Sequence, residues 1–363
     1  MRHIWHIEEF FTGRVPYKDT EKLLEHLNSG DVLNASIKID GSPAVTFGYD
    51  EAGAWSSTKS VFNKQPVKFR DNNGEWFNKL QEPVQRAVTD AYNLANRIVS
   101  EYPNNCKDVI FIGDYLRLCD RGGWQMGFAR HHSNVIAYDN IVNGSMGLSK
   151  NLIMAHSALL PDKSIIHPRR KIKLLGSGIY TNAPALTEMP YTPESNLAAN
   201  QNVLAIVNIL NGNPELADVF TAVIKTGQFD TRELFNLLGA DKQFEMVKRT
   251  SERGKAAVQK RFAEAEDVLI KIFKANDVIN DYVNFMYNLY DIKNKALEEL
   301  NTLAKETTGI ECYIKQNGKY ISTSHEGFVI NIPNTDIRVK LVDINTFTKH
   351  NNDDTVYKPW REE

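Results

Sequence analysis

SIKIDGSPAVTFG, at residues 36–48, is the most informative stretch of this amino-acid sequence. Its two ends have the sequence pattern of β-strands, and Gly41–Ser42–Pro43 between them are residues that typically form a turn. Lys38 therefore stands at a strand-to-turn junction, where its amine can be presented at the mouth of a pocket, with Asp40 two residues further on. Attack of such an amine on an α-phosphate requires its deprotonated form. Nearby cations, a metal ion and partial desolvation would lower the pKa of Lys38 from its ordinary value of about 10.4. The same residues also fit a solvated lysine beside an ordinary β-turn.

The chain divides into stretches that differ in the secondary structure their residue patterns predict. Residues 1–145 mix helical and extended patterns, and residues 146–195 are rich in Gly, Pro and Ser turns. Residues 196–306 carry long helical patterns, and residues 307–363 return to alternating, β-rich sequence. This order predicts a discontinuous α+β core formed by the first and last stretches, a connecting segment, and a mostly helical insertion domain.

The composition is that of a soluble globular protein. Of 363 residues, 42% are hydrophobic and 24% are charged, and no run approaches the roughly 20 apolar residues that span a bilayer. The N-terminus lacks a small-residue cleavage site, which argues against a secretory signal. Three widely spaced cysteines fit neither a disulfide framework nor a zinc site. These features predict a cytoplasmic protein without a membrane partner.

The net charge of −2 indicates that any contact with a polynucleotide must use local positive charge. Two basic clusters are candidates, RRKIK at 169–173 and the stretch 248–261. The predicted nucleic-acid contacts within them are Arg169, Arg170, Lys248, Arg249, Arg253 and Lys255. Both clusters also fit solvated faces of helices or loops.

Further short patterns follow the Lys38 stretch along the chain. They are STKS with Lys59, FIGDY with Asp114, AYDNI with Tyr138, HEGFVI with Glu326, and RVK with Arg338 and Lys340. Each has an ordinary structural reading when taken singly: a strand-end cap, a core tyrosine or a turn residue. In RVK, the two cations alternate and so lie on one face of a strand.

With KIDGS at 38–42, this ordered set resembles the covalent nucleotidyltransferases, which include DNA ligases, RNA ligases and mRNA capping enzymes. Ser42 is closer to phage-type RNA ligases than to the K-x-D-G-x-R form. The resemblance covers about 34–142 and 310–343. It implies a core of antiparallel sheets with flanking helices, and the short tail after Lys340 predicts that the C-terminal oligonucleotide-binding barrel is missing. The chain also resembles uncharacterised phage proteins with a K-x-D-G-x-P-A stretch, which suggests a phage source and the host cytoplasm.

The resemblance assigns roles to the matched residues. Lys38 takes the nucleotide with Asp40 and Lys340 as catalytic partners, and Glu326 and Asp40 hold Mg²⁺ or Mn²⁺. Asp114 is shorter than the glutamate usual at its position, and Arg14 and Lys18 are the candidates to replace the barrel residues that orient pyrophosphate. The predicted nucleotide contacts are Ile37, Gly41, Ser42, Lys59, Asp114, Tyr138, Glu326, Arg338 and Arg14.

The predicted function is that of an ATP-dependent polynucleotide ligase, acting on RNA with 5′-phosphate and 3′-hydroxyl ends. By resemblance it would proceed through a lysyl-AMP and an adenylylated 5′-phosphate. Two alternatives remain open. One keeps nucleotidyl transfer but passes the nucleotide to a protein, a small molecule or a modified base. The other is a catalytically inactive protein of the same fold that binds nucleotide or nucleic acid.

Overall fold

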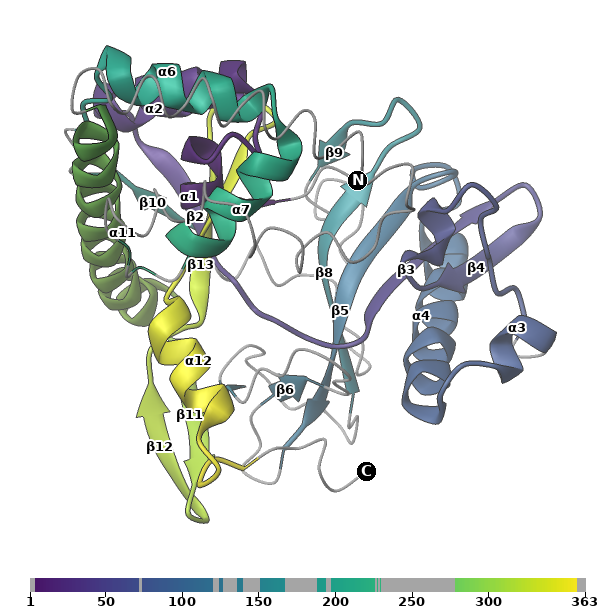
Figure 1. Ribbon diagram of the computed structural model, residues 1–363. Helices are drawn as coiled ribbons and strands as arrows, with labels where there is room; N and C mark the ends of the chain where they lie inside the picture. Colours follow the sequence, from purple (N-terminus) through teal and green to yellow (C-terminus); the bar gives the residue numbers. More distant parts are fainter. Residues whose placement is uncertain are drawn as a thin grey trace, which may run out of the picture.

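The computed structural model describes residues 4–71, 74–119, 124–126, 136–139, 151–166, 188–193, 197–225, 227, 229 and 278–357. These residues form two β-sheets with helices packed around them, which confirms the predicted α+β class (Figure 1). Nearly all strand pairs are antiparallel, as expected, whereas the specific ligase-type core stays a prediction. None of the described helices combines the length and the apolar character needed to cross a membrane.

Sheet A contains β2 (Leu33–Ile37), the strand that leads into Lys38. Its order is β1 (Trp5–His6), β14 (Arg338–Val342), β13 (Gly327–Asn331), β2 and β10 (Glu188–Tyr191). Val329 lies opposite both Ser36 and Lys340, so these three side chains share one face of the sheet. The alternate residues Ile37 and Phe328 are buried on the other face, in the main hydrophobic core.

Sheet B is larger, and β5 (Ile110–Leu118) is its central strand. The others are β12 (Lys319–Thr323), β11 (Glu311–Gln316), β7 (Ala137–Asp139), β6 (Trp124–Met126), β3 (Ala44–Asp50), β4 (Gly53–Ser57), β8 (Asn151–Leu159) and β9 (Ile165–Ile166). One face of β5 presents Phe111 and Tyr115 to a core completed by α4 (Glu82–Glu101). The opposite face carries Asp114 and Leu116, and Leu116 belongs to the core shared with sheet A.

The helices of the predicted insertion pack directly onto the core. Helices α6 (Gln201–Asn211), α7 (Pro214–Ile224) and α11 (Val278–Thr308) share the main core with sheet A and with α1 (Ile7–Phe11) and α2 (Tyr17–Ser29). Tyr282 of α11 donates a hydrogen bond to the carbonyl of Phe11 at 2.8 Å, and Lys293 of α11 forms a buried ion pair with Glu8 of α1. The domain boundaries stay a prediction. We nevertheless expect that replacing 196–306 by a linker would expose this common core.

After β14 the described residues form α12 (Ile344–Asn352) and then a turn that leads to an isolated bridge between Val356 and Gln316. In the part of the chain that the structure describes, no barrel follows the last strand of sheet A.

Gly327 is required by the close approach of two strands. A Cβ atom at this position would lie 2.0 Å from the carbonyl oxygen of Leu341 on β14. Gly327→Ala is therefore expected to lower the free energy of unfolding by more than about 2 kcal/mol, because strand β14 would have to move. Gly212→Ala is the control, since its Cβ would meet nothing closer than 3.5 Å. Urea denaturation measures both variants, and equal stability of the two would contradict the prediction.

Candidate functional site

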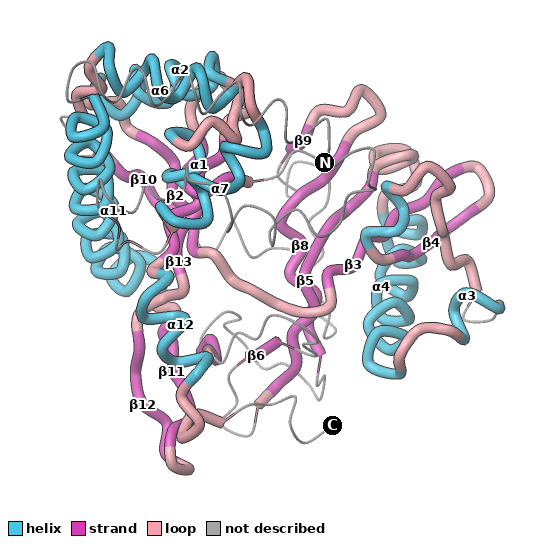
Figure 2. The backbone as a smooth tube through the Cα atoms, in the orientation of Figure 1, coloured by secondary structure: helices cyan, strands magenta, loops and turns pink. Residues whose placement is uncertain are grey.

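The chain crosses from sheet A to sheet B between β2 and β3, and residues 38–43 form this crossing segment (Figures 1 and 2). At one end the amide of Lys38 donates to the carbonyl of Gly327 on β13 at 2.8 Å. At the other end the amide of Ser42 donates to the carbonyl of Tyr115 on β5 at 2.9 Å. Lys38 and Asp40 are thereby held between the two sheets.

Gly41 is explained by the same crossing. A Cβ atom here would lie 2.8 Å from both the Cβ of Asp114 and the carbonyl oxygen of Tyr115. Only glycine lets the segment pass this close to β5. The Asp–Gly pair after the lysine therefore brings the crossing segment against Asp114.

Lys38 is held by two carboxyl groups. Its Nζ lies 2.6 Å from Oδ1 of Asp40 and also contacts Oε1 of Glu326, whose side chain is 3% exposed. Burial alone would lower the pKa of Lys38, but the attraction of Asp40, and then the contact with Glu326, outweigh burial and raise it above the ordinary value. The expectation of a lowered pKa is therefore wrong for the protein without ligand. The lysine is protonated until something competes for its two carboxyl partners.

The carboxyl groups differ in their protonation. Burial, and then the charge of Asp40, raise the pKa of Asp114 to about 7. Burial is also the main cause that raises the pKa of Glu326 to about 8, with Lys38 opposing it. Asp40 keeps a lowered pKa because attraction to Lys38 overcomes its burial. A hydrogen bond joins the carboxyl groups of Asp40 and Glu326, and at neutral pH Glu326 supplies its proton.

The raised pKa of Glu326 predicts how stability depends on pH. The folded protein retains a proton that the unfolded chain releases near pH 4.5, so this contribution is complete below pH 4.5 and is lost as the pH rises through about 8. We expect the free energy of unfolding, measured with urea and EDTA from pH 6.5 to 8.5, to fall with rising pH. Glu326→Gln, which stays neutral, should reduce this slope by up to about one proton. The exposed Glu82→Gln is the control, and identical slopes for Glu326→Gln and wild type would refute the assignment.

Arg338 and Lys340 lie on the same face of β14, as their alternation predicts, and this is the face that Ser36 shares. Burial, and then the charges of Lys38 and Lys225, lower the pKa of Lys340. Nη1 of Arg338 donates to Oγ of Ser157 on β8 of sheet B at 3.4 Å. The two cations therefore border the space between the sheets that Lys38 enters.

Two other residues predicted to contact the nucleotide, Tyr138 and Ile37, have buried side chains. The ring of Tyr138 is completely buried, and its hydroxyl accepts a hydrogen bond from the amide of Asp40 at 3.3 Å. It therefore supports the crossing segment and presents no open face to a purine. The side chain of Ile37 is also buried in the core, so only its backbone can meet a ligand.

Lys59 and Arg14 lie at the edges of the site. Lys59 is exposed at the start of η1 (Lys59–Phe62), and its charge acts on Asp114 and on His156 of β8. Arg14 pairs with Glu9 at 3.1 Å and with Asp218 at 2.9 Å, and the charge of Glu9 in turn acts on Lys340.

The structure also brings in residues that sequence motifs did not mark. They are His156 and Ser157 of β8, together with Glu9 and Lys225, which pair at 2.8 Å beside Lys340. The sequence marks His156 and Ser157 only as two polar residues inside the largely apolar run NLIMAHSALL at 151–160. The basic residues Arg169, Arg170, Lys248, Arg249, Arg253 and Lys255 lie outside the described residues.

The donor set suits magnesium better than zinc. Within the described ranges, no group of three or more His, Cys, Asp or Glu residues gathers as a ready metal site. Asp40 and Glu326 nevertheless supply adjacent carboxylates, and Mg²⁺ typically takes one or two protein carboxylates together with substrate phosphates. These two residues fit a magnesium or manganese ion that arrives with a nucleotide.

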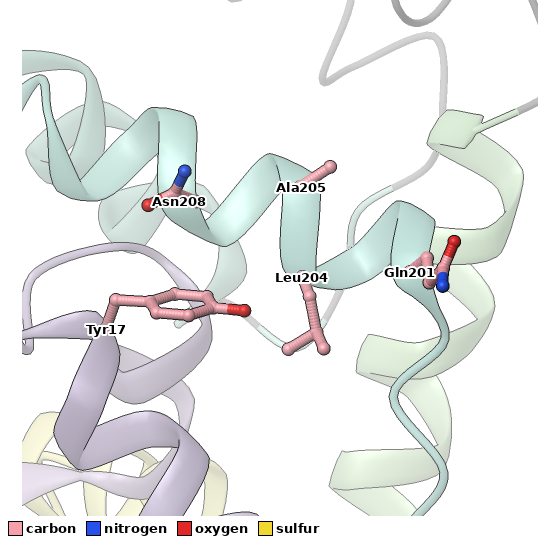
Figure 3. Close-up of a pocket in the computed structure, with 5 residues that line it drawn as sticks. All are labelled: Tyr17, Gln201, Leu204, Ala205 and Asn208. Carbon is pink, nitrogen blue, oxygen red and sulfur yellow. The ribbon is translucent and has the colours of Figure 1, made fainter.

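A separate pocket of about 310 Å³ lies between α2 and α6, lined by Tyr17, Gln201, Leu204, Ala205 and Asn208 (Figure 3). Figure 3 shows the ring of Tyr17 lying beneath α6, with Leu204 beside it. Its lining contains no residue of the crossing segment and no carboxylate or cation. It therefore adds nothing to the chemistry of Lys38.

Fold and site together define an α+β protein with a carboxylate-paired lysine at the crossing between two sheets. The chain belongs to a family of unknown function, DUF6267, whose model matches residues 2–156 and 190–354. The matched segments contain the crossing segment, Asp114, Glu326 and both cations of β14. No curated protein and no solved structure matches the chain significantly.

Proposed function

We propose that this protein is an ATP-dependent nucleotidyltransferase that acts through Lys38 and joins polynucleotide ends. The supporting observation is the position of Lys38 between the carboxyl groups of Asp40 and Glu326, with Arg338 and Lys340 on the adjoining sheet face. This set contains a nucleophile, two hard oxygen ligands and two cations that can neutralise phosphate charge.

In the first step, Nζ of Lys38 attacks the α-phosphorus of ATP. A nitrogen–phosphorus bond forms, the bond to the bridging oxygen breaks, and pyrophosphate leaves. Lys38 goes from an ammonium group to a phosphoramidate N–H and so loses two protons. Oδ1 of Asp40, 2.6 Å from Nζ, accepts one, and the other passes to the departing pyrophosphate or to water. A magnesium or manganese ion bound by Asp40 and Glu326 would supply positive charge beside the lysine, which lowers its pKa. Arg338 and Lys340 stabilise the charge that develops on the phosphate oxygens.

In the following steps, the adenylyl group passes to the 5′-phosphate of a nucleic acid and Lys38 is released. A 3′-hydroxyl then attacks that phosphate, the phosphodiester bond forms, and AMP leaves. RNA is the proposed substrate because KIDGS is closest to the RNA-ligase form of the motif.

One alternative has direct structural support. The raised pKa of Lys38 and the buried ring of Tyr138 both favour a protein that binds a ligand without forming an adduct. Incubation of the pure protein with α-labelled ATP or GTP and magnesium distinguishes the two, because only a transferase retains label after denaturation. Failure of both nucleotides to label the protein would reject the proposed function.

Joining is tested separately, with nicked RNA and nicked DNA as substrates. Lys38→Ala supplied with a pre-adenylylated RNA donor should seal the nick, because that donor bypasses the nucleophile. Ready labelling of wild type without sealing of any polynucleotide would instead indicate a protein, a small molecule or a modified base as acceptor.

A further inference from the structure

Strand β8 contains a β-bulge where it passes the site. Ala155 lies opposite Gly113 and Ser157 lies opposite Ile112, so His156 is an extra residue between two consecutive partners on β5. The bulge places Ser157 on the same face of sheet B as Asp114, because Ile112 and Asp114 are two residues apart. In a regular strand, Ser157 would point to the other face, towards the core under α4.

His156 and Ser157 make a connection between the sheets. Oγ of Ser157 accepts from Nη1 of Arg338 at 3.4 Å and lies 2.9 Å from Nδ1 of His156. Ser157 is buried, and Nδ1 is the one acceptor that its hydroxyl proton meets among the described residues, so the hydroxyl donates to Nδ1. The neutral imidazole then carries its own proton on Nε2, which is a hydrogen-bond donor. Ser157 is the only hydrogen-bond partner of His156 among the described residues.

The surroundings of His156 are rich in positive charge. The charged groups that face it are Arg338 from β14, Lys59 from η1, and Lys38 and Asp40 from the crossing segment. Burial, and then Arg338, lower the pKa of His156 to about 4, so the ring is neutral near pH 7. A neutral donor among three cations and one carboxylate suits an anion, because the cations supply the charge and the imidazole supplies direction.

We infer that His156 is a phosphate-binding residue of the Lys38 site, whose Nε2 and the guanidinium of Arg338 together hold a phosphate group between the two sheets. This inference rests on the proposed function and names a contact that the sequence motifs do not include. Arg338 then serves both sheets, since the hydroxyl that fixes the His156 tautomer also orients the guanidinium.

Inorganic tripolyphosphate with magnesium is the probe, because it has no nucleoside to transfer to Lys38. Calorimetry at pH 7.5 should show that His156→Ala binds tripolyphosphate at least about tenfold more weakly than wild type, the loss of affinity expected when one hydrogen bond to a charged group is removed. His156→Gln should recover part of this loss, since its amide can replace the Nε2 donor. Binding of adenosine should be unchanged in both variants.

His26→Ala, at a partly exposed histidine of α2, is the control. Wild-type affinity of His156→Ala for tripolyphosphate would overturn the inference, and so would equal losses for tripolyphosphate and adenosine, which indicate a purely structural role. If His156→Ala does not fold, His156→Gln is compared with His156→Phe, which fills the space without a donor, and equal affinities of these two variants for tripolyphosphate would overturn the inference. Absence of tripolyphosphate binding by wild type also overturns the inference, while covalent labelling by ATP tests the proposed function independently.

Discussion

Replacing Lys38 by alanine is expected to reduce covalent labelling by ATP at least about a thousandfold, to the background of the assay, because Nζ of this residue forms the bond to phosphorus in the proposed reaction. Lys38→Arg should fail equally, since a guanidinium stays protonated. The readout is retention of α-labelled AMP after denaturing electrophoresis, with the modified residue located by mass spectrometry.

The fold should survive the change at Lys38. Glu326 already holds a proton near neutral pH, so loss of the lysine leaves one ionised carboxylate, Asp40, which is partly exposed. The matched control is Lys79→Ala, at the residue that follows α3 (Glu75–Asn78), where the lysine pairs with Glu75 on the surface. Undiminished labelling of Lys38→Ala, at any other residue, would disprove the assignment of the nucleophile.

Glu326→Gln and Lys340→Met are each expected to reduce labelling at least about a hundredfold, the usual effect of removing one preorganised charged group from a transfer site. Glu326→Gln removes a carboxylate that competes for Lys38 and would bind the metal ion. Lys340→Met removes a cation from the face of β14 that borders Lys38. Because both act on one phosphate site, the double variant should lose less than the product of the two single losses.

Initial rates of labelling at saturating ATP measure these effects, with Glu82→Gln and Lys79→Ala as surface controls of the same chemistry. Labelling of Glu326→Gln within a few fold of wild type would show that Glu326 and Gly327 only shape the start of β13 and take no part in the transfer. Strict additivity of the two losses would mean that Glu326 and Lys340 act on different sites.

Local sequence patterns predicted the parts of the site that depend on near neighbours in the chain. The apolar runs around residues 38–43 became β2 and β3, and their turn residues became the crossing segment. Arg338 and Lys340 came to lie on one face because strand side chains alternate. Such features follow from backbone sterics over a few residues, so they can be derived without knowing what the strand packs against.

Tertiary structure alone decided which distant groups meet and how they are charged. Lys38 and Glu326 are 288 positions apart, and their contact requires the pairing of β2 with β13. The pKa of Lys38 is raised by its neighbour Asp40 first and then by this contact, and the local sequence could not indicate the part of Glu326. Burial of Tyr138 depends likewise on what surrounds β7.

The bulge at His156 and the core shared by α6, α7 and α11 were likewise decided by tertiary contacts and not by local sequence patterns. The amino-acid sequence by itself determined an α+β chain with a lysine, a carboxylate and a glycine at a strand-to-turn junction. The register between strands, the burial of each side chain and the charge around Lys38 were decided only by the tertiary structure. The physical reason is that steric preferences act within a few residues, whereas desolvation and Coulomb interactions depend on every group that folding brings close, whatever its place in the chain.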